Sequence, residues 1–157
     1  MTIKFNAVNT VTQEELENEC EKPYIEYMKE MDGTFIGYAD GSNVVSDSTF
    51  YKEILEALGG RFSDEEYSSY NINWFEEMLT DLPWFEDNSN NKGYKNYVLV
   101  VSNYDKILIE SPEKKYIKYY KNCLENAVNW WTNDIITYMV GGPNCRKNFT
   151  ILLIENK

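Results

Sequence analysis

Apolar residues follow two patterns along this chain, continuous runs and helical spacings. The runs YVLVVS (97–102) and FTILLI (149–154) are almost entirely apolar, which is typical of central strands buried on both faces. TFIGYA (34–39) predicts a third strand, because the turn signal Asp40-Gly41 follows it directly. With helical patterns between them, these runs predict an α/β fold with a small, mostly parallel three-stranded sheet, packed with helices in a two-layer or three-layer arrangement.

Three helices are predicted between these strands. The first begins at a cap, either Ser46 or Asp47, and its apolar residues recur at helical spacing: Phe50, Ile54, Leu55 and Leu58. The last begins at Ser111-Pro112, a cap followed by proline at the first helical position. Its predicted apolar face is long and aromatic: Tyr116, Ile117, Tyr120, Leu124, Ala127, Val128 and Trp131. Such apolar faces predict that both helices pack against the sheet.

The middle helix, predicted for residues 71–82, has two distinct faces. Its apolar stripe consists of Ile72, Phe75, Leu79 and Leu82, with Trp74 and Met78 alongside. Residues four positions apart lie above one another on a helix, so the polar side has a single row: Asn73, Glu77 and Asp81, flanked by Glu76 and Thr80. We expect this row to face away from the core.

Residues 1–33 form a separate predicted segment. A charged helix is expected early in it, with Thr12 as the cap, and Pro23 ends that helix. The next stretch, residues 24–31, fits either a strand or a second helix. We therefore divide the chain into an N-terminal extension, which adds a helix and room for an extra strand, and a main domain over residues 34–157.

Acidic residues dominate the chain and concentrate in one segment. The formal net charge is −11, and residues 61–90 contain eight acidic residues, one arginine and several large aromatics. A nucleic-acid-binding protein needs lysine and arginine to displace counterions, and anionic membrane surfaces also select basic residues, so we expect neither partner. Complementary charge favours a basic partner. No signal-peptide pattern and no apolar run of the roughly 20 residues that span a membrane occur, and we expect a cytoplasmic protein.

The residue types present argue against an enzyme and against a metal site. The chain has no histidine, which is the usual general base near neutral pH and the commonest metal ligand. Its three cysteines, Cys20, Cys123 and Cys145, form no C-x-x-C pair, and we expect free thiols. Glu76 and Glu77 do not form a catalytic or metal-binding pair, because neighbouring helix positions diverge by about 100°. We expect no cofactor.

The order of elements and two local motifs resemble the barstar family of ribonuclease inhibitors. ADGSNVVSDSTFYKEILEAL (39–58) is similar to the family's opening strand, Asx-Gly turn and first helix. NINWFEEMLTDL (71–82) resembles its signature second helix, N-x-D-A-L-x-D-x-L-T-x-x. The strand at 97–102, the helix after Ser111 and the strand at 149–154 match the elements that follow. The resemblance covers about residues 34–154 and leaves three extra loops near 59–66, 85–95 and 131–147.

This resemblance implies a partner-binding surface centred on the second helix. In the family, an acidic residue of that helix enters the ribonuclease active site in place of substrate phosphate, and Glu77 holds the matching position. A tyrosine before the helix and an acidic residue on the last long helix also contribute in the family. The resulting candidates are Tyr67, Tyr70, Asn73, Trp74, Glu76, Glu77, Thr80, Asp81 and Glu125. Asn73 replaces an aspartate of the motif and Trp74 replaces an alanine, which points to a different cognate enzyme.

Plainer roles stay open for several of these residues. Glu77 and Asp81 also fit the solvated side of an amphipathic helix, and Glu125 also fits an ordinary surface acid. Trp74 fits the core as well as an interface, and the two tyrosines can pack over the helix N-terminus. The first function that follows is a 1:1 inhibitor of a basic ribonuclease or other nuclease toxin. The alternatives are an immunity protein that neutralises a non-ribonuclease toxin through a different surface, and a carboxylate enzyme or regulatory domain.

Overall fold

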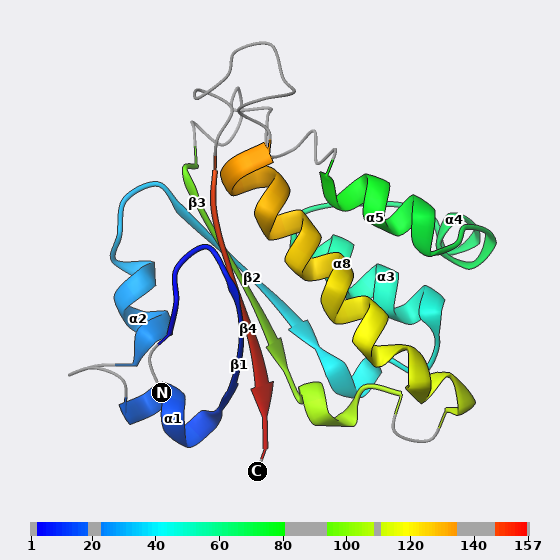
Figure 1. The fold of residues 1–157 in the computed structure, drawn as a ribbon, viewed down its shortest axis with the longest axis horizontal. Coiled ribbons are helices and arrows are strands. Elements are labelled where there is room, and N and C mark those ends of the chain that lie inside the picture. Colours follow the sequence, from blue (N-terminus) through cyan, green and yellow to red (C-terminus); the bar gives the residue numbers. More distant parts are fainter. Residues whose placement is uncertain (1–2, 19–22, 81–93, 109–110, 135–146, 157) are drawn as a thin grey trace.

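The centre of the molecule is a parallel sheet. The computed structural model describes residues 3–18, 23–80, 94–108, 111–134 and 147–156. Within them the strand order is β1-β4-β3-β2, formed by β1 (Val8–Thr12), β2 (Thr34–Asp40), β3 (Asn96–Ser102) and β4 (Asn148–Glu155) (Figure 1). The three strands predicted from apolar runs are confirmed as β2, β3 and β4. The N-terminal segment adds the extra strand, so the sheet has four strands rather than three.

The two central strands are buried on both faces, as their apolar runs predicted. Alternate residues of β3 point to opposite sides of the sheet, so Leu99 joins the larger core and Val100 the smaller one. In β4, Ile151 and Leu152 divide in the same way. A parallel sheet of this kind needs cover on each face, and the fold has three layers.

The larger core lies under the helices that follow β2 and β3. They are α3 (Asp47–Ala57), α4 (Asp64–Ser69), α5 (Ile72–Thr80) and α8 (Ile117–Asn129), all to the right of the sheet in Figure 1. Three short 3₁₀ turns connect these parts: η1 (Gly41–Asn43), η2 (Tyr104–Lys106) and η3 (Pro112–Tyr116). A π-helical turn, η4 (Trp130–Asp134), continues α8. The predicted start of the last helix at Pro112 is therefore a 3₁₀ turn, and the α-helix begins five residues later.

Local signals in the sequence explain where the first of these helices starts and ends. Of the two caps considered for α3, Ser46 is the one used, because its hydroxyl accepts a hydrogen bond from the Thr49 amide within a reciprocal capping box. Gly59, with φ at 99°, ends the helix in a left-handed conformation that glycine adopts without strain. The end of α3 lies so close to β2 that a methyl group on Gly37 would overlap the Ala57 carbonyl.

The N-terminal segment covers the other face. It contributes β1 and two helices, α1 (Gln13–Asn18) and α2 (Tyr24–Lys29). Thr12 caps α1 as predicted, since its hydroxyl accepts a 3.1 Å hydrogen bond from the Glu15 amide. The stretch that fitted either a strand or a helix is helical in α2. Its side chains complete a second core against β3 and β4: Ile3, Val11, Leu16, Tyr24 and Met28 are all buried there.

Asn6 connects the N-terminal segment to β4 by hydrogen bonds. Its backbone amide donates to the Thr150 hydroxyl at 3.0 Å, and its side-chain oxygen accepts from the Phe149 amide at 2.9 Å. Asn6 has a φ of 56°, a left-handed conformation that asparagine tolerates better than most residues. These bonds fix the register in which β1 adds to β4.

The shared core leads to a prediction about the division at residue 34. A chain restricted to residues 34–157 loses β1 and the five buried side chains of the second core, each of which stabilises the fold by roughly 1.5–3 kcal/mol. Because whole domains are stable by only about 5–15 kcal/mol, we expect this fragment to lose cooperative unfolding. Urea titration followed by tryptophan fluorescence measures it.

Leu16→Ala in the full chain is the matched control. It empties one position of the same core and should lower the free energy of unfolding by about 2–5 kcal/mol while cooperativity remains. A fragment that unfolds at the same urea concentration as the full chain would show that residues 34–157 fold by themselves.

Candidate functional site

Helix α5 is held firmly on its inner side. Phe75 and Leu79 are fully buried, as the apolar stripe predicted, and Ile72 is half-buried. The indole N–H of Trp131 donates to the Leu79 carbonyl at 2.9 Å, which satisfies a backbone oxygen near the end of the helix. At the start, the side-chain oxygen of Asn71 accepts from two amides of the first turn, at 3.0 and 3.3 Å.

The opposite side of α5 presents the polar row to solvent. Asn73 and Glu77 are exposed, in agreement with the predicted direction of the row. Glu76 is half-buried, and its carboxylate accepts a 2.9 Å hydrogen bond from the Asn126 side chain of α8. The Thr80 hydroxyl donates back to the carbonyls of residues 76 and 77 and so is not directed at a partner. Asp81 and Leu82 lie outside the described residues.

The two candidate tyrosines have different environments. Tyr67 is 2% exposed, which is a correction to its proposed contact with a partner: its ring packs edge-on against Phe62 and contributes to the core. Burial raises the pKa of Tyr67 to about 12, so the phenol stays protonated at neutral pH. Tyr70 is 49% exposed and lies just before α5. Of the two candidates, Tyr70 is therefore the solvent-accessible tyrosine.

Trp74 joins the core to the surface. Its ring stacks on Tyr70 with centroids 4.9 Å apart and planes 20° apart. On its other sides it meets Phe62 and Tyr67 edge-on, at centroid distances of 5.3 and 6.1 Å. Trp74 is half-buried: it packs on the core and it supports the exposed ring of Tyr70.

Helix α4 begins inside the stretch near 59–66, which we expected to be an extra loop relative to the barstar family. That expectation was wrong for residues 64–66, which are helical. A reciprocal capping box forms between Ser63 and Glu66, the S-x-x-E signal that would have located this helix. Asp64, Glu65 and Glu66 are exposed on its first turn. Lys52 pairs with Asp64 at 3.0 Å, a solvent-exposed bridge that contributes little to stability. The helix extends the acidic surface beyond α5.

The structure does not bring Glu125 together with α5. Its side chain is exposed on α8 beside a shallow hollow that Asn6, Ala7 and Val8 also line. Residue 126, one position later, is the one that reaches α5. A helical pattern identifies the exposed positions of α8 but does not show which neighbour each position faces, and so it could not separate these two residues.

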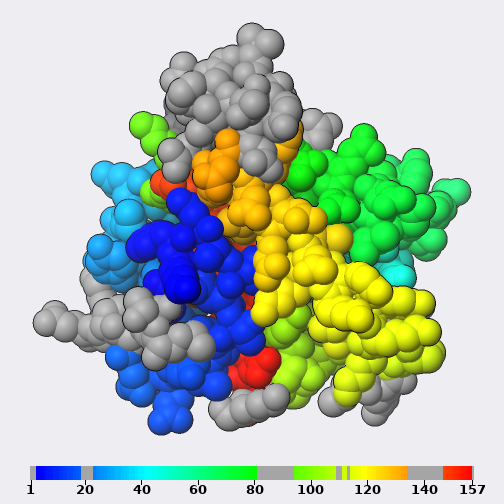
Figure 2. All heavy atoms as spheres, in the orientation of Figure 1, coloured from blue at the N-terminus to red at the C-terminus, as the bar shows by residue number. Residues whose placement is uncertain are grey.

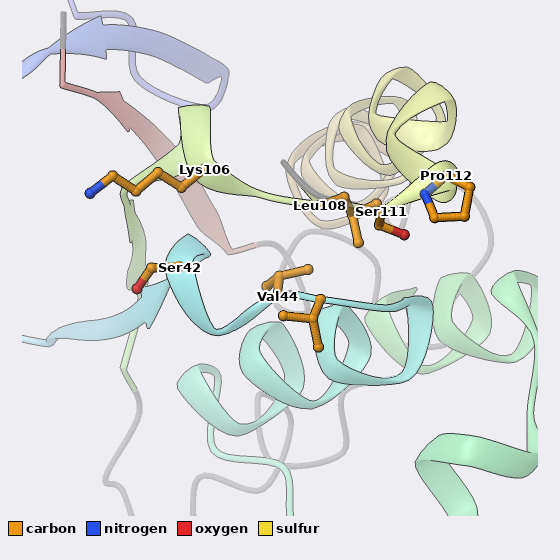
Figure 3. A pocket seen from close by; sticks show the side chains of 7 residues that line it. Ser42, Val44, Lys106, Leu108, Ser111 and Pro112 are labelled. Carbon is orange, nitrogen blue, oxygen red and sulfur yellow. The ribbon is translucent and has the colours of Figure 1, made fainter.

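A hollow at the carboxyl ends of β2 and β3 offers little chemistry. It lies between η1, the start of α3 and the segment after η2, with Val44, Leu108 and Pro112 along it (Figure 3). The Lys106 side chain extends away from these three residues, and the hydroxyls of Ser42 and Ser111 lie at separate points (Figure 3). These polar groups do not converge as they do in a catalytic site.

The described residues contain no group of three or more metal-binding side chains among histidine, cysteine, aspartate and glutamate. In the same part of the chain, no helix combines the length and the apolar character needed to cross a membrane.

Comparison with known proteins agrees with this arrangement. The family model for Barstar (barnase inhibitor) matches residues 35–141, which are most of the chain. No curated protein and no solved structure matches. The matched range contains all but the first residue of β2 and the whole of α3, α4, α5, β3 and α8, and therefore includes the acidic surface described above. The chain belongs to the Barstar (barnase inhibitor) family.

Proposed function

We propose that this chain is the inhibitor of a ribonuclease toxin and acts as a cytoplasmic immunity protein. In this proposal α5 and the residues just before it cover the basic active site of the enzyme in a 1:1 complex. The inhibitor catalyses nothing and prevents RNA from entering. Membership of a family described as barnase inhibitors supports the class of partner.

The exposed polar row of α5, with Tyr70 at its start, is the observation on which this proposal depends. Glu77 and Asn73 project from a helix whose inner side is fully packed. The Asn71 cap and the Trp131 bond hold the two ends of the helix, and Asn126 holds the Glu76 carboxylate. Side chains placed in advance lose little entropy on binding, which favours tight inhibition.

The exposed Glu77 carboxylate of the row suits a phosphate-binding cleft. A ribonuclease binds a polyanion, so lysine and arginine line its active site. Contacts between carboxylates and guanidinium groups are charge-assisted and can be bidentate. Glu77 is therefore the residue that we propose for the place of a substrate phosphate.

We predict that Glu77→Ala weakens inhibition of the cognate ribonuclease at least tenfold, which corresponds to about 1.4 kcal/mol. The fold should persist, because the side chain is exposed. Inhibition constants for a panel of small basic ribonucleases, including barnase and any nuclease encoded in a neighbouring reading frame, measure the effect.

Glu26→Ala is the matched control. It removes the same charge from an exposed position of α2, distant from α5, and inhibition should change less than about threefold, or about 0.7 kcal/mol. Equal effects of the two substitutions would contradict the assignment of Glu77.

Alanine substitutions at Tyr70 and Trp74 should distinguish effects on inhibition from effects on the stability of the fold. Tyr70→Ala removes an exposed ring, so we expect weaker inhibition with a loss of less than about 1 kcal/mol in the free energy of unfolding. Trp74→Ala opens the aromatic cluster and should lower that free energy by about 3 kcal/mol. Urea titration and inhibition assays on both variants test this, and the reverse ranking of stabilities would overturn the packing described for Trp74.

The acidic surface should also affect the rate of association. Raising the ionic strength from about 0.1 M to about 1 M shortens the Debye length from about 10 Å to about 3 Å. We expect the association rate with a basic ribonuclease to fall strongly over this range, and the dissociation rate to change much less, because long-range attraction acts before contact. Stopped-flow mixing measures both. A salt-independent association rate would argue against charge steering by α4 and α5.

A further inference from the structure

A basic segment borders the acidic surface. Residues 114–121, KKYIKYYK, contain no acidic residue, and they hold four of the 15 basic residues of a chain whose net charge is −11. We call these four residues the lysine strip: Lys114, Lys115, Lys118 and Lys121. They lie on η3 and the first turns of α8. The protein therefore presents both signs of charge close together.

The strip is accessible and is interleaved with tyrosines. Lys115 and Lys118 are exposed, and so are Tyr116 at 38% and Tyr119 at 47%, although Tyr116 was expected on the buried face. Each of the two ammonium groups lies 5.2 Å from the centre of the ring that follows it in the chain, within range of a cation–π interaction. Large aromatics with cations beside them are typical of interface anchors.

A groove separates the strip from α5. It has a volume of about 470 Å³, with Ile72 and Glu76 on one wall and Tyr116, Tyr119 and Cys123 on the other. Burial raises the pKa of the Cys123 thiol to about 11, so this residue acts as a neutral, apolar part of the floor. Helices α5 and α8 lie next to each other on the face shown in Figure 2, where the green and yellow surfaces meet.

We propose that the lysine strip and this groove bind an acidic segment of the same ribonuclease, with an apolar side chain of that segment in the groove. The inference rests on the proposed function. It adds a second contact, between the lysine strip and acidic residues of the enzyme, to the contact between the acidic surface and the basic active site. An enzyme that fits must place carboxylates beside its basic cleft. Like charges that face each other across an interface cost free energy, so the lysines would reject basic nucleases that lack those carboxylates.

The charge around the groove selects this occupant. Lysines and exposed tyrosines also occur in surfaces that bind single-stranded RNA. Here, however, two acidic residues, Asp47 and Glu76, line the groove itself, so an extended polyanion that crossed it would be repelled. A short acidic segment meets the lysines without crossing α5.

Charge reversal tests the proposal, because two explanations predict opposite signs. If the lysines act only through the overall field, Lys115→Glu with Lys118→Glu makes the inhibitor more acidic and should strengthen binding to a basic enzyme. If they contact carboxylates, the same double variant should weaken binding at least tenfold. The probe is the ribonuclease in the panel that the unaltered protein inhibits most strongly.

Lys4→Glu with Lys29→Glu is the matched control, with the same change in charge at exposed positions of the N-terminal segment. We expect it to leave affinity within about threefold, or about 0.7 kcal/mol. Tyr116→Ala with Tyr119→Ala, which leaves charge unaltered, should weaken binding at least fivefold if the groove is occupied. All the substituted residues are exposed, so we expect these variants to fold. Urea titration of each variant checks that lost binding is not the result of misfolding.

The outcomes separate this inference from the proposed function. One outcome is that Glu77→Ala abolishes inhibition, whereas Lys115→Glu with Lys118→Glu leaves it equal or makes it stronger. That outcome would overturn the contact of the lysine strip and keep the contact of α5. If the unaltered protein inhibits no ribonuclease, both fail. Two further results would overturn the choice of occupant: binding of a short single-stranded RNA that charge reversal abolishes, or a dimer of this chain, seen by sedimentation, that the reversal dissociates.

Discussion

Strands that are buried on both faces impose the main constraint on this structure. β3 and β4 place side chains alternately into two cores, so neither face of the sheet can be left to water. The larger core requires α3, α5 and α8, and the smaller one requires the N-terminal helices. Once Phe75 and Leu79 are committed to the larger core, Asn73 and Glu77 have to face outward. The direction of the proposed inhibitory row is thus a consequence of how the sheet is covered.

The sequence patterns located the main elements because those elements have strong periodicity. The predicted strands at 97–102 and 149–154 agree with β3 and β4 to within a residue or so at each end, and the middle helix agrees with α5 as far as it is described. α4 was missed because a six-residue helix is too short for an apolar stripe, although its capping box was present. β1 was left open because a five-residue edge strand with partly polar residues has little signal.

The candidate site was predictable only in part, for a different physical reason. Spacing within one helix places residues on its faces, and this was enough for Asn73 and Glu77. Which neighbouring element a face meets depends on tertiary packing. Tyr67 and Tyr70 are both tyrosines in the same short stretch and both contact Trp74, yet only Tyr67 is buried, because α4 turns it inward against Phe62, whereas Tyr70 stacks on Trp74 and stays exposed. Glu125 and Asn126 differ in the same way, since only the latter reaches α5.

The hydrogen bonds of Asn6 join parts of the chain that are made at very different times. Its partners, Thr150 and Phe149, are more than 140 positions later in the sequence, and β4 lies between β1 and β3 in the sheet. During synthesis, β1 therefore has to wait for β4 before it can join the sheet, whereas β3 can already pair with β2. Such distant pairing slows folding. Helix α5 has left the ribosome well before its supporting core can close, so the outward row of α5 is held in its final position only after β4 has emerged.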